Sequence, residues 1–216
     1  MTNEKPILSR LRIDPMPILL GKVRKYKMTL IMLVSTSYTK LKFALEGIEF
    51  ASGCTFYGVP ISKRSYNSRV SIGHSCCFRS HVKSNLIGIQ QSCILATHRE
   101  NATLEIGNDC GFSGTVIGAS ESIIIGDRVL CGANTLITDF DWHPSSPQLR
   151  HEPNSSNSAP VVIKDNAWLG YGVVVLKGVT IGENSIITAN SVVVSDIPAN
   201  VIAGGNPAKV IKEISS

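Results

Sequence analysis

Small apolar residues recur along this chain at intervals of six positions. Glycines directly follow several of them, such as Gly126, Gly132, Gly170 and Gly182. The clearest run lies near the C-terminus: Ile163, Leu169, Val175, Ile181, Ile187 and Val193. The same interval joins three earlier groups: Ile125, Cys131 and Ile137; Ile106 and Phe112; and Ile48, Cys54, Pro60, Tyr66, Ile72 and Phe78. The chain is therefore built on a six-residue repeat.

Such a repeat fits neither the two-residue period of an ordinary strand nor the 3.6-residue period of a helix. It is typical of a β-solenoid, in which one aliphatic side chain per short strand points to a narrow axis and neighbouring coils bury each other's apolar ladder. Three strands of six residues make a triangular coil of about eighteen residues. We therefore predict an all-β solenoid over residues 48–203.

Interruptions of the repeat predict where the coils are irregular. The repeat slips by one residue between Phe112 and Ile125 and is weak over residues 84–100, which predicts bulged corners or a small excursion. The largest break covers residues 138–162, a segment rich in Pro, Ser and Asn without the repeated aliphatics. We expect a loop that protrudes from the solenoid there, and long loops on rigid scaffolds often carry function.

Residues 1–47 precede the repeat and differ from it in charge. The first 50 residues contain nine Lys or Arg against four Asp or Glu, whereas residues 51–216 contain twelve of each. The basic residues alternate with apolar clusters over much of this segment: Lys22, Arg24, Lys25, Lys27, Lys40 and Lys42. We predict a helical segment that either caps the open end of the solenoid, with its apolar face inward, or lies on anionic lipid at the membrane surface. Residues 204–216 would form a C-terminal tail.

Composition narrows the classes of protein that remain. With 216 residues, 43% of them hydrophobic and 17% charged, the chain is long enough for one well-buried domain. Its longest apolar run is shorter than the roughly 20 residues of a membrane-spanning helix, so we expect no such helix in this chain. Six cysteines without metal-ligand spacing, and no secretory signal, predict reduced thiols, no bound metal and a cytoplasmic location. The sequence has no basic stripe with interleaved aromatic residues, so we expect no nucleic-acid partner.

The segment APVVIKDNAWLGYGVVVLKGVTIGENSIITANSVVVSDIPANVIAGGNPAKVIKEI (residues 159–214) closely resembles the hexapeptide-repeat acyltransferases. The similar branch contains maltose and galactoside transacetylases and polysaccharide O-acetyltransferases, and with IIIGDRVLCGANTLITDFDWHP the resemblance covers residues 104–214. It implies a left-handed parallel β-helix, a homotrimer with active sites between subunits, and transfer of acetyl from acetyl-CoA to a sugar hydroxyl. The handedness rests on the resemblance alone, because crossover connections are ordinarily right-handed.

The protruding loop contains the catalytic residue that the resemblance implies. His143, in the stretch TDFDWHPSSPQLRHEP, matches the histidine base that takes the proton of the acceptor hydroxyl during attack on the thioester carbonyl. Its other ring nitrogen needs an orienting partner, which Asp141, Asp139 or a backbone carbonyl could supply. We expect Trp142 and Ser113 to contact the acceptor.

Other matched residues concern the acyl donor. The resemblance places the backbone N–H of Tyr171 at the thioester oxygen, where one preorganised donor contributes about 3–4 kcal/mol. Trp168 would flank the pantetheine arm or be an ordinary packing aromatic, and Ala189 offers a second backbone contact. Lys209 and Lys212 match basic residues that meet the nucleotide phosphates, or are simply solvated lysines.

Two departures from the family pattern bear on the substrates. Galactoside-type relatives carry Asn-Phe-Asn where this chain has Gly111 to Ser113, so we do not expect a galactoside acceptor. Relatives carry Thr-Lys where this chain has Val194 and Ser195, so Ser195 is a weaker candidate for a phosphate contact. Because residues 40–64 look more like the polysaccharide O-acetyltransferases, we predict O-acetyl transfer in surface polysaccharide biosynthesis.

Two other functions stay open. The same scaffold could transfer acetyl to the amine of a nucleotide-activated amino sugar, or could be a solenoid without acyl transfer. A zinc-dependent anhydrase of this architecture needs two histidines separated by four residues, and this chain has no such pair. We interpret His98 and His151 as surface loop residues, and His74 and His81 as corner residues of the early coils.

Overall fold

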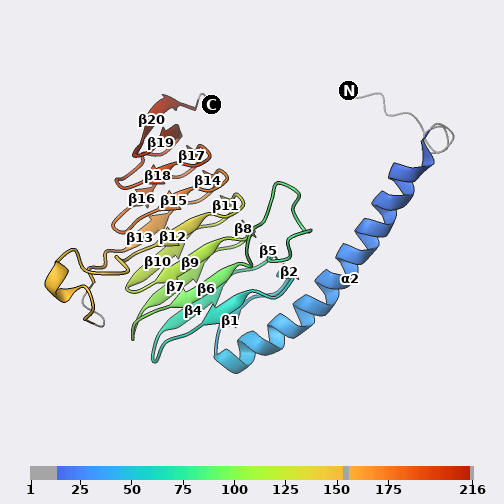
Figure 1. Ribbon diagram of the computed structural model, residues 1–216, viewed down its shortest axis with the longest axis horizontal. Coiled ribbons are helices and arrows are strands. Elements are labelled where there is room, and N and C mark those ends of the chain that lie inside the picture. The colour runs from blue at the N-terminus through green and yellow to red at the C-terminus, as the bar shows by residue number, and fades with distance from the viewer. Residues whose placement is uncertain (1–13, 153–155, 215–216) are drawn as a thin grey trace.

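The strands wind around one axis as a triangular prism of stacked coils (Figure 1). This computed structural model describes residues 14–152 and 156–214.

The strands form three sheets, one on each side of the prism. Sheet A contains β1 (Glu49–Phe50), β4 (Arg69–Ile72), β7 (Thr103–Ile106), β10 (Ser122–Ile125), β13 (Val161–Ile163) and β16 (Thr180–Ile181). Sheet B contains β2 (Thr55–Tyr57), β5 (Cys77–Arg79), β8 (Gly111–Ser113), β11 (Leu130–Cys131), β14 (Trp168–Leu169), β17 (Ile186–Ile187), β19 (Val201–Gly205) and β20 (Ala208–Glu213). Sheet C contains β3 (Ile61–Lys63), β6 (Ile94–Thr97), β9 (Val116–Ala119), β12 (Leu136–Thr138), β15 (Val174–Val175) and β18 (Val192–Val193).

Within each sheet a strand pairs in parallel with the strand one coil before and one coil after, except that β20 runs antiparallel to β19. The repeated aliphatics from Ile163 to Val193 are all fully buried and point to the axis, as predicted. Tyr66 breaks the prediction, because its side chain is 80% exposed in the turn between β3 and β4. The repeat therefore locates the inward positions of the later coils, but fails once in the earlier ones.

The core changes in width along the axis. In sheet B, register alignment places Phe56, Phe78 and Phe112 in one inward row, and their rings stack with centroids 5.1 and 4.9 Å apart. The same row continues with Cys131 and Leu169 in the next coils. The early coils thus hold larger side chains than the later ones, which have no aromatic residue at these positions.

Asparagines occupy many of the corners between sheets. Asn166, Asn184 and Asn200 each adopt the left-handed backbone conformation, with φ of 58–59°. Asparagine tolerates this conformation better than most residues. Asn166 donates to Asn184 at 3.1 Å and Asn184 to Asn200 at 2.8 Å, so the side chains form a hydrogen-bonded ladder along one edge. This ladder keeps successive corners in register.

The three predicted irregularities are present. Residues 80–93 make an excursion between β5 and β6. Residues 139–152, which include a 3₁₀ turn (Pro147–Leu149), and residues 156–160 protrude between β12 and β13. The slip after Phe112 falls at the corner between β9 and β10, where the backbone N–H groups of Ser120, Glu121 and Ser122 donate to the carboxylate of Asp139. An unpaired backbone donor inside a protein is costly, so this carboxylate is what makes the irregular corner stable.

The predicted N-terminal helix is α2 (Pro15–Glu46), which ends at Gly47 in the left-handed conformation, with φ of 68°. Its C-terminal part covers the first coil: Phe43 is fully buried and meets the ring of Phe56 edge-on at 5.6 Å. The rest of the helix extends past the solenoid along one flank of the molecule (Figure 1). Among the described residues, no helix combines the length and the apolar character needed to cross a bilayer.

The cap interpretation is right for this C-terminal part but wrong in one respect. It expected the apolar face of the helix to lie inward, with the lysines in water. Instead, the helix exposes a second row of large apolar side chains on its outer face, such as Leu30 and Leu41, which are 52% and 61% exposed. Most of the apolar side chains of this helix therefore face outward, and the side against the coil buries Ser35, Thr39 and Phe43, which hydrophobic clusters alone do not reveal.

We expect Phe43→Ala to destabilise the protein by about 3–5 kcal/mol, because it removes the ring that closes the first coil and leaves a cavity. Leu45→Ala is the matched control: Leu45 lies two residues away with 81% of its side chain exposed. Its effect on the free energy of unfolding should stay within about 0.5 kcal/mol. Chemical denaturation measures both. Equal effects would show that Phe43 does not anchor the helix.

Candidate active site

The protruding loop leaves the solenoid at the corner between sheets C and A. Its two ends are held together by backbone hydrogen bonds, from Asp141 N–H to the Asn157 carbonyl at 2.9 Å and from Ala159 N–H to the Asp139 carbonyl at 2.8 Å. Arg99 reaches the loop from the side and donates to the carbonyl and hydroxyl of Ser156 at 2.5 and 2.8 Å. The base of the loop is therefore fixed to the rigid coils.

Asp139 is structural, not an orienting partner of His143. It is fully buried, and its two oxygens accept the N–H groups of Ser120, Glu121 and Ser122 at 2.6–2.8 Å. Burial raises the pKa of its carboxyl group, while these N–H groups act in the opposite direction. Its hydrogen-bonding capacity is used to hold the corner below the loop.

His143 is exposed near the start of the loop, and its Nδ1 lies 3.1 Å from the backbone carbonyl of Arg150. A carbonyl oxygen can only accept a hydrogen bond, so Nδ1 carries the proton in this contact. In the neutral ring the lone pair then lies on Nε2, the nitrogen that a general base needs free. Of the three predicted partners, the backbone carbonyl is the one in contact. Asp141 instead binds Lys177, with Oδ1 and Nζ 2.6 Å apart.

An aromatic cluster borders His143. Trp142 is 55% exposed and packs against Phe140, with ring centroids 4.8 Å apart, and against His98 at 4.9 Å. Burial, and then the charge of Lys63, lower the pKa of His98, which favours its neutral form. The interpretation of His98 as a surface loop residue is therefore wrong: its backbone N–H donates to Ala119 in sheet C, and its ring is part of this cluster.

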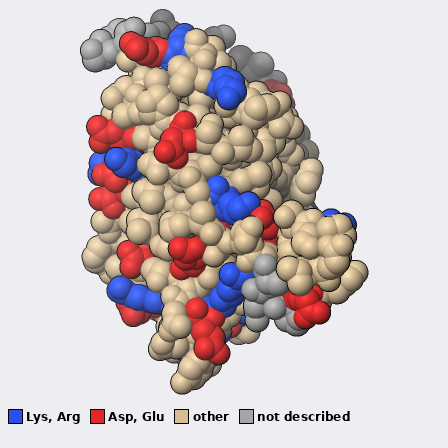
Figure 2. Space-filling view, turned by 90° about the vertical axis from the view of Figure 1, so that its left-hand side faces the viewer, with Lys and Arg blue, Asp and Glu red and all other residues tan. Residues whose placement is uncertain are grey.

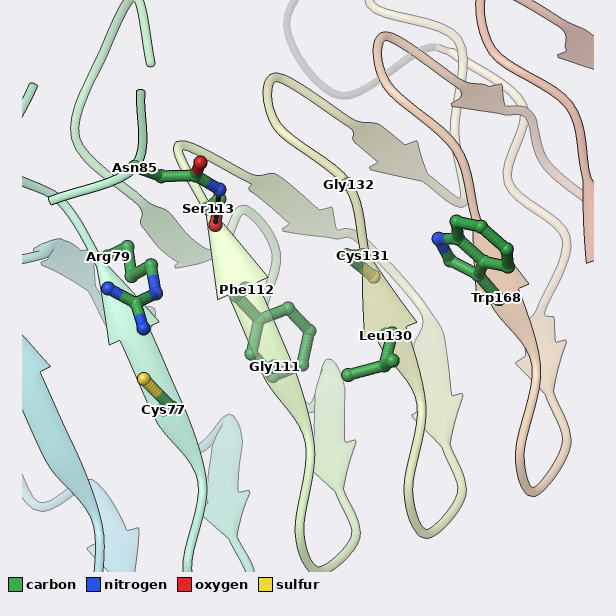
Figure 3. Close-up of a pocket in the computed structure, with 10 residues that line it drawn as sticks. All are labelled: Cys77, Arg79, Asn85, Gly111, Phe112, Ser113, Leu130, Cys131, Gly132 and Trp168. Atoms are coloured by element: carbon green, nitrogen blue, oxygen red, sulfur yellow. Dashed lines mark hydrogen bonds between the residues drawn. The ribbon is translucent and has the colours of Figure 1, made fainter. Parts of the chain in front are cut away.

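A second group of predicted residues lies on the outer face of sheet B, around a hollow of about 300 Å³ (Figure 3). Ser113 stands at one end, where its hydroxyl accepts a hydrogen bond from Asn85 at 3.2 Å. Trp168 stands at the other end, 51% exposed, beside Leu130 of the preceding coil. Because half of the Trp168 side chain is in water, it is not an ordinary core aromatic.

Tyr171 and Ala189 lie one coil apart at the corner between sheets B and C. The Tyr171 carbonyl accepts the N–H of Asn190 at 2.7 Å, and a Cβ added to Gly170 would come within 2.7 Å of the Ala189 nitrogen, so these corners stack closely. Within residues 14–152 and 156–214, the backbone N–H groups of Tyr171 and Ala189 have no hydrogen-bond acceptor. Both amides are therefore available to a ligand.

A single chain does not bring all the predicted residues together. Asp141, Trp142 and His143 form a loop group at the corner between sheets C and A. A sheet group lies across the prism, on sheet B and its corner with sheet C: Ser113, Trp168, Tyr171 and Ala189. The other three candidates do not connect the two groups into one cleft. Lys209 and Lys212 are exposed on β20, and Ser195 is exposed on the same edge as the loop.

Residues 160–195 match the family described as bacterial transferase hexapeptide (six repeats). Over this segment the chain is similar to the hexapeptide-repeat transferases. The galactoside O-acetyltransferase of Lactococcus lactis subsp. lactis is 41% identical to it over 116 residues, which cover 54% of this chain and 55% of the relative. WbbJ of Escherichia coli, a candidate O-acetyl transferase of lipopolysaccharide biosynthesis, is 38% identical over 104 residues, or 45% of this chain and 53% of the relative. The chain thus spans about half the length of the relatives it matches.

A solved structure shows the same fold over more of the chain. A variant of AntD, an N-acyltransferase from Bacillus cereus in complex with dTDP-4-amino-4,6-dideoxyglucose and coenzyme A, aligns with a TM-score of 0.62. The alignment covers 83% of this chain and 91% of that one at 17% identity, so the likeness concerns the fold alone. With the repeat, it confirms the predicted all-β architecture: a left-handed parallel β-helix with a protruding loop and a helical N-terminal segment.

We expect Asp139→Ala to lower the free energy of unfolding by about 2–4 kcal/mol, because the N–H groups of a buried corner lose their acceptor. Asp196→Ala is the matched control: Asp196 is exposed and accepts only the N–H of Thr180, at 2.7 Å. Its cost should be about 0.5–1.5 kcal/mol. Urea titration of both variants measures the difference, and an equal or smaller loss for Asp139→Ala would contradict the role given to this residue.

Proposed function

We propose that the protein is an acetyl-CoA-dependent O-acetyltransferase in which His143 is the general base. The observation that carries the proposal is the contact between Nδ1 of His143 and the Arg150 carbonyl. It fixes the ring on a loop whose base is tied to the solenoid, and it leaves Nε2 of the neutral ring free to accept a proton. A sugar hydroxyl is a weak nucleophile until a positioned base removes its proton.

The reaction needs two proton transfers and no acyl-enzyme. Nε2 takes the hydroxyl proton as the acceptor oxygen forms a bond to the thioester carbon. The C–S bond then breaks, and the imidazolium returns the proton to the departing thiolate of CoA. The carbonyl oxygen is negatively charged in between, and the unpaired N–H of Tyr171 would stabilise it.

The sheet group is suited to the extended donor molecule. The Trp168 ring is exposed along the path from the hollow on sheet B to the corner, and the Ala189 N–H lies one coil above that of Tyr171. Backbone donors in one row suit the amides of a pantetheine arm. Lys209 and Lys212 follow on β20, on the same sheet, where their charges would meet phosphates. Coenzyme A in the AntD complex supports this choice of donor.

We further propose that the active site is shared between subunits of a homotrimer. The loop group and the sheet group lie on opposite sides of one prism, so a second chain is needed to bring them together. The outer face of sheet C offers a contact surface, because one register row across it is entirely aliphatic: Ile61, Ile94, Val116, Leu136, Val174 and Val192. Closed threefold symmetry would place each such row against a neighbour.

The acceptor we propose is a sugar unit of a surface polysaccharide or its precursor. The names of the galactoside transferase and of WbbJ support a saccharide and an oxygen nucleophile. The exposed Trp142 ring beside His143 provides an apolar surface of the kind on which sugar rings pack, and Ser113 offers a hydroxyl. All six cysteines are unpaired, which fits a reducing compartment such as the cytoplasm.

We expect His143→Ala to lower kcat for acetyl transfer by about 10²–10⁴-fold with little change in acetyl-CoA affinity, because only proton removal is lost. His151→Ala is the matched control, since His151 is exposed in the same loop. It should keep nearly normal turnover. Candidate sugars and amino sugars, assayed in parallel, separate oxygen from nitrogen acceptors. Normal turnover of His143→Ala would end the assignment of the base.

A shared site predicts complementation between two inactive variants. Ala189→Trp should block the donor's path at an exposed corner, whereas His143→Ala removes the base. Co-expressed chains would form mixed trimers in which one interface combines an intact His143 with an intact Ala189, so part of the activity should return. The two variants mixed after separate assembly serve as the control. No recovery in co-expressed trimers, or full activity of a monomer, would contradict the shared site.

A further inference from the structure

The outer face of α2 carries large apolar side chains along its whole length. At about 100° per residue they fall within about 140° of the helix circumference. Each is 42–81% exposed: Met16, Leu19, Leu20, Val23, Tyr26, Leu30, Leu33, Val34, Tyr38, Leu41 and Leu45. The buried residues Ser35, Thr39 and Phe43 lie on the opposite side, against the first coil. We call the exposed row the outer stripe.

The outer stripe is too long to be an extension of the core. The helix has 32 residues, and its packing contacts with the solenoid are made near its C-terminal end, with β1 and β2. Figure 1 shows the other end running free of the coils. Exposed apolar patches of this extent on soluble proteins mark interaction surfaces.

Basic residues border the outer stripe on both sides. Lys22 and Lys40 lie along one margin, Arg24 and Lys42 along the other, and Lys27 lies within it. The helix carries six basic residues and one acidic residue, Glu46, which gives it a net charge of 6 − 1 = +5. On the face of the molecule that carries the protruding loop, in contrast, acidic and basic side chains are intermixed (Figure 2).

The excursion between β5 and β6 extends the same surface. Arg24 donates to the Lys83 carbonyl at 3.3 Å, which holds the excursion against the helix. Between them is a hollow of about 490 Å³ with an apolar lining and three basic residues: Leu20, Val23, Met28 and Leu86, with Arg24, Lys27 and Lys83. Val82 and Ile87 in the excursion are also exposed, at 55% and 61%. Apolar surface and positive charge thus occur together a second time.

We propose that the outer stripe and the excursion bind the surface of an anionic lipid bilayer, with α2 lying in the plane of the membrane. Apolar side chains would enter the boundary between headgroups and acyl chains, and the bordering lysines and arginines would meet lipid phosphates. A second copy of this helix is a poorer partner, because packing two outer stripes together would bring two charges of +5 side by side. The proposal does not rest on the proposed acetyl transfer.

The test is co-sedimentation of the full chain with vesicles of phosphatidylcholine alone or with about one third phosphatidylglycerol, at low and high salt. Wild type should bind the anionic vesicles at low salt, and the binding should weaken at high salt. The variant Lys22→Gln, Lys27→Gln, Lys40→Gln should lose about fivefold in affinity per residue, or about a hundredfold in all. A second variant, Val23→Glu with Leu30→Glu, should lose binding without loss of fold, since both side chains are exposed.

The matched control removes three basic residues elsewhere, by Arg69→Gln, Arg128→Gln and Lys164→Gln on sheet A and its corners. It should bind as wild type does, and equal melting temperatures check the fold of every variant. Absence of salt-sensitive binding, equal binding to uncharged vesicles, or equal loss in the control would overturn the proposal. So would a wild type that ignores vesicles while the stripe variants change the oligomeric state, because the surface would then be a subunit contact.

Discussion

Each coil of this molecule is held by the apolar ladder of the coil before it and the coil after it. Strands of neighbouring coils lie about 4.8 Å apart, so an inward side chain that moves by one position loses its contacts on both sides. The straight strands therefore tolerate no insertion, and every added residue must leave the prism at a corner. This is so for the excursion after β5, the irregular corner after β9 and the long loop after β12. The loop that contains His143 leaves the prism at a corner for the same reason.

This constraint explains which parts of the structure can be predicted from the sequence. The six-residue spacing predicts inward aliphatic residues such as Ile163 and Ile187, and the absence of that spacing predicts the loop. Tyr66 shares the spacing but lies in a turn, because the six-residue interval alone does not distinguish a strand from the corner beside it. The sequence pattern assigns the apolar residues of α2 to a single inward face for a similar reason. A list of apolar clusters does not say which side of a helix contacts the core and which side faces solvent.

The site is predictable only in part because its contacts are tertiary. His143 follows from the resemblance, but its partner is a carbonyl seven residues away, which no residue type reveals. His98 was missed because the register of sheet C decides its position, and the repeat is too weak before β6 to count coils up to it. The sequence does not distinguish the roles of Asp139 and Asp141. Asp139 accepts backbone N–H groups at a corner, whereas Asp141 pairs with Lys177.

The two ends of the prism are closed in different ways. At the first coil, α2 lies over β1 and β2, and at the last coil β20 folds back antiparallel on β19. In sheet B, a parallel strand from another molecule cannot continue the ladder at either place, because α2 packs on β2 and β20 runs in the opposite direction. Open strand edges are the usual starting points for fibre growth. These two closures thus protect sheet B from lengthening end to end in a molecule made of stackable coils.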